Sequence, residues 1–492
     1  MAVESTHPDY DKNLPNWNMV SDCVSGSKTV KKRTGGTGNG LSNSLYSMAG
    51  ARYLPPPNAD DNSAANRARF AAYRDRANYV NFTGSTKEGM LGMVMRKKPE
   101  FVLPAQIEYL ENNATGGGLT LSQLARQVTG EVLEKARDGL LIDYPEAVDG
   151  LTVAQVQEMN LQASIVPYKA ECIINWQTAV VYGRKMLTLV VLLESAEIAE
   201  DKYTNKKEKQ YRVLSLEGGM YVQRLFNEKG ENITSNITAD GADIDFIAPR
   251  MFDGSYWTEI PFLFVGAENN DENVDKSPLI DIAEVNLAHY RNSADFEESS
   301  FITGQATPVF TGLSQSWVDK VMKNGIHFGS RAGILLPAGA DGKLLQANEN
   351  TLPSKGMEMK ERQIVQIGAR LITDAGGAET AEAARIRYAG QNSKLGNIVN
   401  NVEEALEKAL FFAYLFMAPP VDNYEEAGIE VEINKEFYEK TIDPQTVMAD
   451  IALLDRGVIA KTDVRDSLRK AGKLNRPDDE IEGEAESTSP LE

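Results

Sequence analysis

The 492-residue chain has few of the residues that build disulfides and metal sites. It contains only two cysteines, Cys23 and Cys172, and three histidines, His7, His289 and His327. The cysteines lie far apart and have no CxxC partner, and the histidines have no HExxH or HxH spacing. Free thiols are therefore expected, and His289 is interpreted as a packed helix residue. We predict no metal and no cofactor.

Long apolar runs are also missing. No run approaches the roughly 20 residues that a membrane span needs. The first residues, MAVESTHPDYDKNLPNWN, lack the basic and then apolar pattern of a signal peptide. We expect no membrane partner and a protein that is made in the cytoplasm.

The chain has no excess of positive charge, since 51 Lys and Arg stand against 71 Asp and Glu, for a net charge of −20. Proteins that grip nucleic acid are usually basic. A negative wall would nevertheless suit a protein through which DNA slides, because it repels phosphate. Acidic surfaces are also common in soluble cytoplasmic proteins, so charge alone leaves both interpretations open.

Motifs of catalysis are absent from the sequence. The string GGTGNG, Gly35–Gly40, lacks the GxxxxGK[ST] spacing of a phosphate loop. There is no nucleophile elbow and no dinucleotide fingerprint. Asp295, Glu297 and Glu298 gather near the end of a predicted helix, which would suit a metal or an acid–base pair. We interpret them instead as facing a neighbouring subunit or a channel, and predict no catalytic residue.

The first half of the chain predicts a mixture of helices and antiparallel strands. Residues 1–62 are polar and rich in Gly, Ser and Asn, and we expect this segment to be flexible. Apolar residues at helical spacing predict helices at 63–81 and 119–137, and Asp138-Gly139 is interpreted as the end of the second helix. Short runs rich in β-branched residues, with a turn at Gly218-Gly219, predict a meander. The predicted strands are 139–144, 168–176, 186–194, 211–217, 220–227 and 260–265.

The second half predicts three long helices around a glycine-rich insert. Ser277 and Pro278 are interpreted as the N-cap and first residue of a helix that ends near Ser300. Residues 302–353 contain the strand candidates PVFTG and GILLP, and a helix follows from about Lys355 to Ile372. After a short loop, a helical pattern about 50 Å long extends to Met417, at about 1.5 Å per residue. Such length suggests an element that spans a large assembly; the alternative is a bundle core inside one subunit.

Five strings, in order along the chain, resemble portal proteins of tailed bacteriophages. The resemblance is to a branch long catalogued as an uncharacterised domain family, and it covers roughly residues 65–473. No single string is diagnostic, but the five in order are strong together. The strings are YVNFTGSTKEGMLGMVMRKKP (79–99), LARQVTGEVLEKARDGLLIDYP (124–145), AECIINW (170–176), IPFLFVGAENNDENVDKSPLIDIAEVNLAHYRNSADFEESSF (260–301) and ETAEAARIRYAG (379–390).

The resemblance implies an α+β portal fold with wing, stem, clip and crown, assembled as a ring of about twelve subunits. In this sequence the tunnel loop is short, and composition alone sets the clip boundaries. The implied segments are a flexible N-terminus (1–62), the wing (63–276), a stem helix (277–301), the clip (302–353), a second stem helix (354–373), a tunnel loop (374–380), a long wing helix (381–418), a wing strand region that includes GIEVEIN (419–443), a crown (444–475) and a disordered acidic tail (476–492).

The implied function is a conduit at one capsid vertex for DNA packaging and ejection. The implied partners are further copies of the chain, double-stranded DNA, terminase, the major capsid or scaffolding protein and a head–tail adaptor. The implied location is the virion, after assembly in the host cytoplasm. The residues implied to line the channel are Asp374, Ala375, Gly376, Gly377, Ala378, Glu379 and Thr380 of the tunnel loop, and Lys355, Lys360, Gln363, Gln366 and Arg370 of the second stem helix.

A different class of function stays open beside this one. An intracellular enzyme, or another phage head or scaffold protein, could share the same helical pattern. The shape of the particle separates these alternatives, because a conduit requires a ring with a central channel. A compact monomer or dimer with turnover would favour an enzyme.

Overall fold

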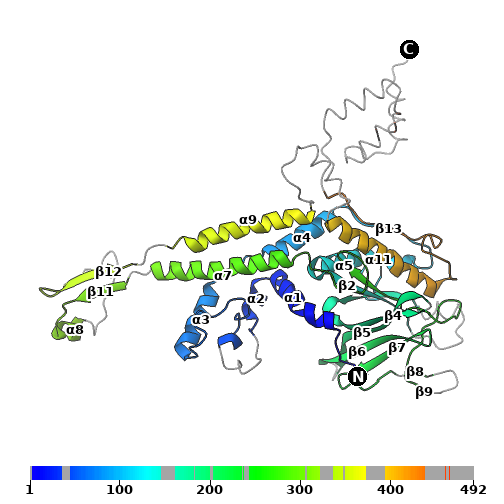
Figure 1. Ribbon diagram of the computed structural model, residues 1–492, viewed down its shortest axis with the longest axis horizontal. Helices are drawn as coiled ribbons and strands as arrows, with labels where there is room; N and C mark the ends of the chain where they lie inside the picture. Colours follow the sequence, from blue (N-terminus) through cyan, green and yellow to red (C-terminus); the bar gives the residue numbers. More distant parts are fainter. Residues whose placement is uncertain are drawn as a thin grey trace, which may run out of the picture.

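The computed structural model consists of a compact body from which a long helical hairpin projects (Figure 1). Helices and antiparallel sheets are both present, so the predicted α+β class is confirmed. The structure describes residues 3–35, 45–145, 161–181, 183–199, 203–234, 236–237, 243–304, 307–321, 336–346, 350–372 and 394–437, and the single residues 460, 462 and 465.

Helix α5, Leu121–Lys135, is the centre of the body. Its start is fixed by a capping box, in which the Thr120 hydroxyl accepts from the backbone N–H of Gln123 and the Gln123 side chain accepts from that of Thr120. It ends two residues earlier than predicted, because Ala136 takes a left-handed conformation with φ 59°. The other helical elements before the first sheet strands are α1 (Pro8–Ser25), α2 (Ser27–Lys32), η2 (Leu45–Ser47), α3 (Ala64–Arg76), α4 (Phe82–Val94) and η3 (Glu108–Glu111).

The N-terminal segment is part of the body, and the prediction that it is flexible is wrong for the residues described. Helix α1 packs on α4, α5 and α7 and buries Trp17, Val20 and Cys23. The indole N–H of Trp17 donates to the backbone carbonyl of Lys135 over 3.0 Å. The polar composition of 1–62 gave the wrong expectation because α1 needs only one apolar face to join the core.

Two sheets carry the strands of the body. In the first, β2 (Arg137–Asp143) lies between β10 (Phe262–Gly266) and β3 (Ser164–Lys169). The second contains most of the predicted meander, with the order β4 (Ile173–Val181), β5 (Arg184–Ala199), β6 (Asn205–Glu217) and β7 (Met220–Asn227). The strand predicted at 260–265 is instead β10 of the first sheet, and the strand predicted at 168–176 is divided between β3 and β4. The β6–β7 turn is at Gly218-Gly219, where both φ angles are positive as a tight turn requires. The short pairs are β8 (Asn236–Ile237) with β9 (Asp243–Ile244), and β1 (Glu100–Val102) with β13 (Glu430–Glu432).

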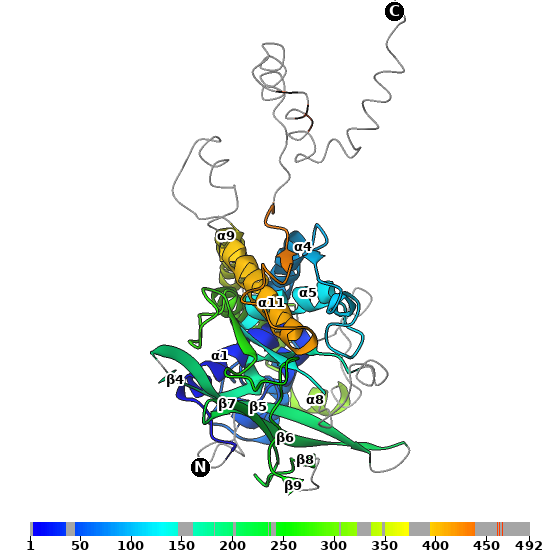
Figure 2. The same cartoon turned by 90° about the vertical axis from the view of Figure 1, so that its right-hand side faces the viewer.

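The core lies between these sheets and the helices. Figure 2 shows the β4–β7 sheet on one side of the body, α5 and α11 (Lys394–Met417) on the other, and α1 between them. Trp257, fully buried, packs against Phe412 and Phe416 of α11. Both cysteines are free thiols, as predicted.

The C-terminal half contains α7 (Ile280–Thr303), β11 (Thr307–Thr311), α8 (Gln315–Val321), β12 (Asp341–Leu345) and α9 (Leu352–Ile372) before α11. The prediction that Ser277 caps α7 is wrong: its hydroxyl donates to the backbone carbonyl of Glu134, and Leu279 precedes the first helical residue. The strand that pairs with PVFTG is β12, whereas most of GILLP lies outside the described residues. The first part of the predicted wing helix, residues 381–393, the acidic tail and all but three residues of the predicted crown also lie outside them.

Candidate functional site: the hairpin of helices α7 and α9

The base of α7 is fixed to the body by one buried amide, Asn286. Its Oδ1 accepts hydrogen bonds from the Tyr79 hydroxyl and from the hydroxyl and backbone N–H of Thr83, over 3.0–3.1 Å. Its Nδ2 donates to the backbone carbonyl of Val80 over 2.8 Å. Because a buried amide is costly unless it is fully bonded, this arrangement holds α7 in one position against the start of α4.

Helices α7 and α9 run antiparallel and meet along a partly polar seam (Figure 1). His289 of α7 is fully buried and packs its ring edge-on against Phe82, as expected for a packed residue rather than a metal ligand. Its Nε2 lies 3.2 Å from Oε1 of Glu361 on α9, and burial lowers the pKa of the imidazole. One turn along the seam, the backbone of α9 comes close to the side-chain amide of Asn292 on α7. This approach is possible because residue 356 of α9 is a glycine and has no Cβ atom.

The hairpin extends well beyond its contacts with the body. The 24 residues of α7 and the 21 of α9 correspond to lengths of about 36 Å and about 31 Å at about 1.5 Å per residue. In α9 the buried apolar side chains are Ile364 and Leu371, among the residues described. Leu352, Met359 and Val365 are 75%, 55% and 71% exposed, so α9 presents apolar groups on faces that a single copy does not cover.

At the far end of the hairpin, β11 and β12 form a two-stranded tip (Figure 1). Every residue of β12 is exposed, including Leu344 and Leu345. A two-stranded sheet of this kind is marginally stable by itself. Each strand has one unpaired edge in the described part of the tip, which is an arrangement suited to contacts with another chain.

Two of the three carboxylates near the end of α7, which are predicted to face a neighbouring subunit or a channel, are bound inside the subunit. Asp295 accepts a hydrogen bond from the Tyr73 hydroxyl over 2.7 Å, and Glu298 forms an ion pair with Arg76. Both partners belong to α3. These contacts fix α3 against α7, so two of the three carboxylates have a structural role inside the subunit.

Residues 278–417 match a family described as a domain of unknown function, DUF4055. The match covers the hairpin and α11, and less than a third of the chain. No curated protein matches.

Among solved structures, the neck of an empty gene transfer agent particle, computed with C6 symmetry, has a TM-score of 0.40 and 12% identity over 81% of this chain and 91% of that one. A chain of the virion of a native gene transfer agent particle has a TM-score of 0.40 and 14% identity over 82% and 91%. Scores this low do not establish a shared fold.

Within the DUF4055 segment, most of the predicted channel residues of α9 share one face. Lys355, Gln363, Gln366 and Arg370 lie within about 80° of one another around the helix axis, on the side away from Ile364 and Leu371, and all four are exposed. Lys360 departs from this face: it is half-buried beside Gly356, near the seam with α7. The predicted tunnel loop, residues 374–380, lies outside the described residues.

The loop that precedes α7 is held by a buried arginine of β2 that the sequence analysis did not identify. Arg137 of β2 is fully buried between the rings of Trp176 and Phe264, with its Cζ 4.3 and 4.0 Å from the ring centroids. Its Nη1 donates to the backbone carbonyls of Glu272 and Asn273, and burial lowers the pKa of the guanidinium to about 9. Arg137 thus positions the loop that leads into the hairpin. No pattern in the sequence indicates this role, because Arg137 stands beside Asp138-Gly139, which is interpreted as a helix end.

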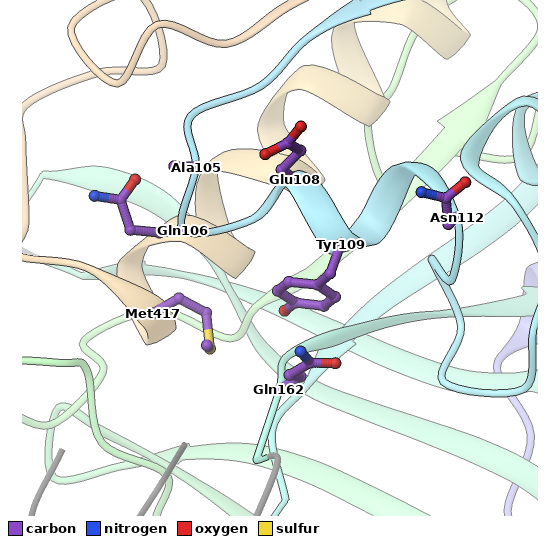
Figure 3. A pocket seen from close by; sticks show the side chains of 7 residues that line it. All are labelled: Ala105, Gln106, Glu108, Tyr109, Asn112, Gln162 and Met417. Atoms are coloured by element: carbon purple, nitrogen blue, oxygen red, sulfur yellow. The ribbon is translucent and has the colours of Figure 1, made fainter. Parts of the chain in front are cut away.

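One pocket of the body, of about 540 Å³, lies beside the C-terminal end of α11 (Figure 3). The Tyr109 hydroxyl at its wall donates to the backbone carbonyl of Ala163. The lining has one carboxylate and three amides, which can bind polar groups but do not form an acid–base pair. The lining residues are Ala105, Gln106, Glu108, Tyr109, Asn112, Gln162 and Met417.

Two other kinds of site were sought in the part of the chain that the structure describes. No group of three or more His, Cys, Asp or Glu there has the geometry of a metal site. None of the helices there combines the length and the apolar composition that crossing a membrane requires.

Proposed function

We propose that this chain is the portal subunit of a tailed bacteriophage. Copies of it would form a closed ring at one capsid vertex, through which double-stranded DNA is packaged and ejected. The ring would contact the major capsid or scaffolding protein, terminase would dock on it during packaging, and a head–tail adaptor afterwards. The sequence resemblance, which runs along most of the chain, supports this function.

The observation that carries the proposal is the uncovered apolar surface of the hairpin. An isolated subunit gains little by exposing Val365 on the flank of one helix and Phe301 and Ile302 on the other. Cyclic association covers such surfaces in every copy, because each subunit presents the same two flanks to its neighbours. The base of the hairpin is held by Asn286, so the helices would enter a ring with a fixed orientation.

Within such a ring, we assign the exposed face of Lys355, Gln363, Gln366 and Arg370 to the channel. The exposed Leu352 and Met359 lie on this face as well, so the bore would be lined by apolar side chains beside the polar ones. Lys360 is not part of this assignment, because it lies near the α7 seam. The loop of residues 374–380 follows α9 directly and, in this proposal, narrows the channel at one end.

Val365 provides the test of the proposal. It lies on the flank of α9, between the proposed channel face and the seam with α7, and is 71% exposed. Val365→Asp would place a charge in each contact between neighbouring subunits, where it is costly to bury. We expect the variant to need at least about tenfold more protein for ring formation, measured by mass photometry, while its circular dichroism stays that of the wild type.

Val180→Asp is the matched control, because Val180 is 73% exposed and lies on β4, far from the hairpin in the fold. It should assemble like the wild type. Negative-stain images of the wild type should show rings with a central channel. Wild-type protein that stays monomeric at micromolar concentration, or equal assembly of Val365→Asp and Val180→Asp, would contradict the proposal.

A further inference from the structure

The charge of the chain is unevenly distributed. Residues 26–76 contain nine Lys and Arg and three Asp and no Glu, a net charge of +6, although the whole chain has a net charge of −20. The remaining residues therefore have a net charge of −26. A positive region in so acidic a chain is a place where a polyanion would meet attraction instead of repulsion.

Six basic residues lie on four segments that contact one another, and they are here called the basic cluster: Lys31, Lys32, Arg33, Arg52, Arg74 and Arg291. The segments are the end of α2, the loop at 49–53, the end of α3, and α7. Backbone hydrogen bonds join Gly50 and Arg52 to the carbonyl of Arg33. The side chain of Arg74 donates to the backbone carbonyl of Ala49, so α3 ends beside the same loop.

The charge of the basic cluster is only partly neutralised. Asp22, which is buried, binds Arg33 over 2.7–2.9 Å, and Asp75 binds Arg74 over 2.6–2.8 Å. Lys31 and Arg291 are instead held by the backbone carbonyls of Asp75 and Tyr53, which orient a cation without cancelling its charge. Six cations thus stand against two carboxylates, and Lys32, Arg33, Arg52 and Arg291 are exposed.

The position of the basic cluster separates it from the proposed channel. Helices α2 and α3 lie on the opposite side of α7 from α9 (Figure 1). If α9 faces the bore of a ring, the basic cluster faces away from it. DNA that touches this surface is therefore not DNA passing between the α9 helices.

We propose that the basic cluster binds the phosphate backbone of double-stranded DNA, independently of sequence. The proposal rests on the proposed function only in that a DNA conduit brings such DNA to this chain. Four of the six side chains are arginines, whose planar guanidinium groups bind phosphate oxygens in pairs. Such cations contact the phosphates and not the bases, so their binding does not depend on the DNA sequence. This property suits a surface that binds any packaged genome.

The test is binding of a fluorescein-labelled duplex of about 30 base pairs, followed by anisotropy between about 50 and about 200 mM salt. Lys32 and Arg52 are the side chains to change, because no carboxylate binds either of them in the described structure. We expect the full-length wild type to bind at the lower salt, and Lys32→Glu/Arg52→Glu to bind at least about tenfold more weakly. The slope of log affinity against log salt should also become shallower by about 2, since each lost phosphate contact removes about 0.9.

The control is Arg184→Glu/Lys229→Glu, which makes the same charge change at exposed positions on the meander sheet. It should bind DNA within about twofold of the wild type. Absence of wild-type binding, or equal loss in both double variants, would overturn the proposal. Binding of labelled polyglutamate but not of duplex would also overturn it, and would indicate an acidic protein partner.

Mass photometry of the same samples reports ring formation separately. Rings that do not bind the duplex would refute DNA binding by the basic cluster and leave the proposed function intact. Binding by a chain that forms no rings would refute the proposed function instead.

Discussion

At the scale of single residues, Gly139 shows that a glycine interpreted as a helix end can instead be required by packing inside a strand. It lies in the middle of β2, paired with Phe264 and Tyr168 on either side. A Cβ atom at this position would lie 2.5 Å from Cζ of Phe262 and 2.8 Å from Cδ1 of Ile173. Both of these side chains are buried in the core, so neither can move aside freely.

We therefore predict that Gly139→Ala lowers the free energy of unfolding by about 1–3 kcal/mol, because it overpacks the core. Gly89→Ala is the matched control: Gly89 is an exposed residue inside α4, and nothing lies within 4 Å of the position of its Cβ. There the substitution should be neutral or stabilise the protein by up to about 1 kcal/mol, because alanine favours the helix. Thermal unfolding by circular dichroism measures both, and a stability loss at position 89 as large as that at 139 would contradict the explanation.

At the scale of elements, α1 is where sequence reasoning was least successful. Tyr10, Leu14, Trp17 and Val20 recur at intervals of three and four, which is the signal of an amphipathic helix. Pro15 and the many polar residues around them hid this signal. The proline is tolerated in α1 although it lacks an N–H, and the helix is held by its contacts with the body.

Where patterns were strong and local, the sequence was sufficient. The buried run of β2, the meander β4–β7 with its turn at Gly218-Gly219, and the helices at α5, α7 and α9 were all predicted, with ends that differ by a few residues. What could not be predicted depends on distant partners. Asn286 matters because Tyr79 and Thr83 reach it, and the basic cluster exists because four separate segments meet. The spacing of residues along the chain does not show which distant segments contact one another in the fold.

Removal of α1 tests its role in the body. A chain that begins at Ser27 would lose Trp17 and expose the buried Lys135, whose ammonium lies between Glu131 and Glu171 at 2.8–2.9 Å. Loss of an apolar face and opening of a buried ion-pair network are each expected to cost several kcal/mol. We expect aggregation, or a fall in melting temperature of about 10 °C or more.

The control for this truncation is at the other end of the chain. Removal of the acidic residues after Asn475 should leave the melting temperature unchanged, because that segment has too little apolar content to pack. If both truncated proteins have the melting temperature of the wild type, α1 is not the integral part of the core that its contacts indicate.

At the scale of the whole molecule, the net charge of −20 and the apolar flanks of the hairpin have opposite effects on assembly. Bringing several such chains together concentrates negative charge, which opposes association. Covering Val365 and the exposed apolar residues of α7 favours it. Salt affects the charge repulsion and the burial of apolar surface differently. It screens the repulsion, with a screening length of about 10 Å at 0.1 M, and leaves the gain from apolar burial nearly unchanged.

We therefore predict that the fraction of chains in rings rises as salt increases from about 50 to about 500 mM, measured by sedimentation velocity at a fixed protein concentration. Binding of duplex DNA at the basic cluster should fall over the same range, since it depends on the attraction between cations and phosphates. Val365→Asp should lower the ring fraction at every salt concentration but keep the upward trend, because the overall repulsion remains. Rings that dissociate as salt rises would mean that ion pairs between neighbouring copies hold the assembly, and not the apolar flanks of the hairpin.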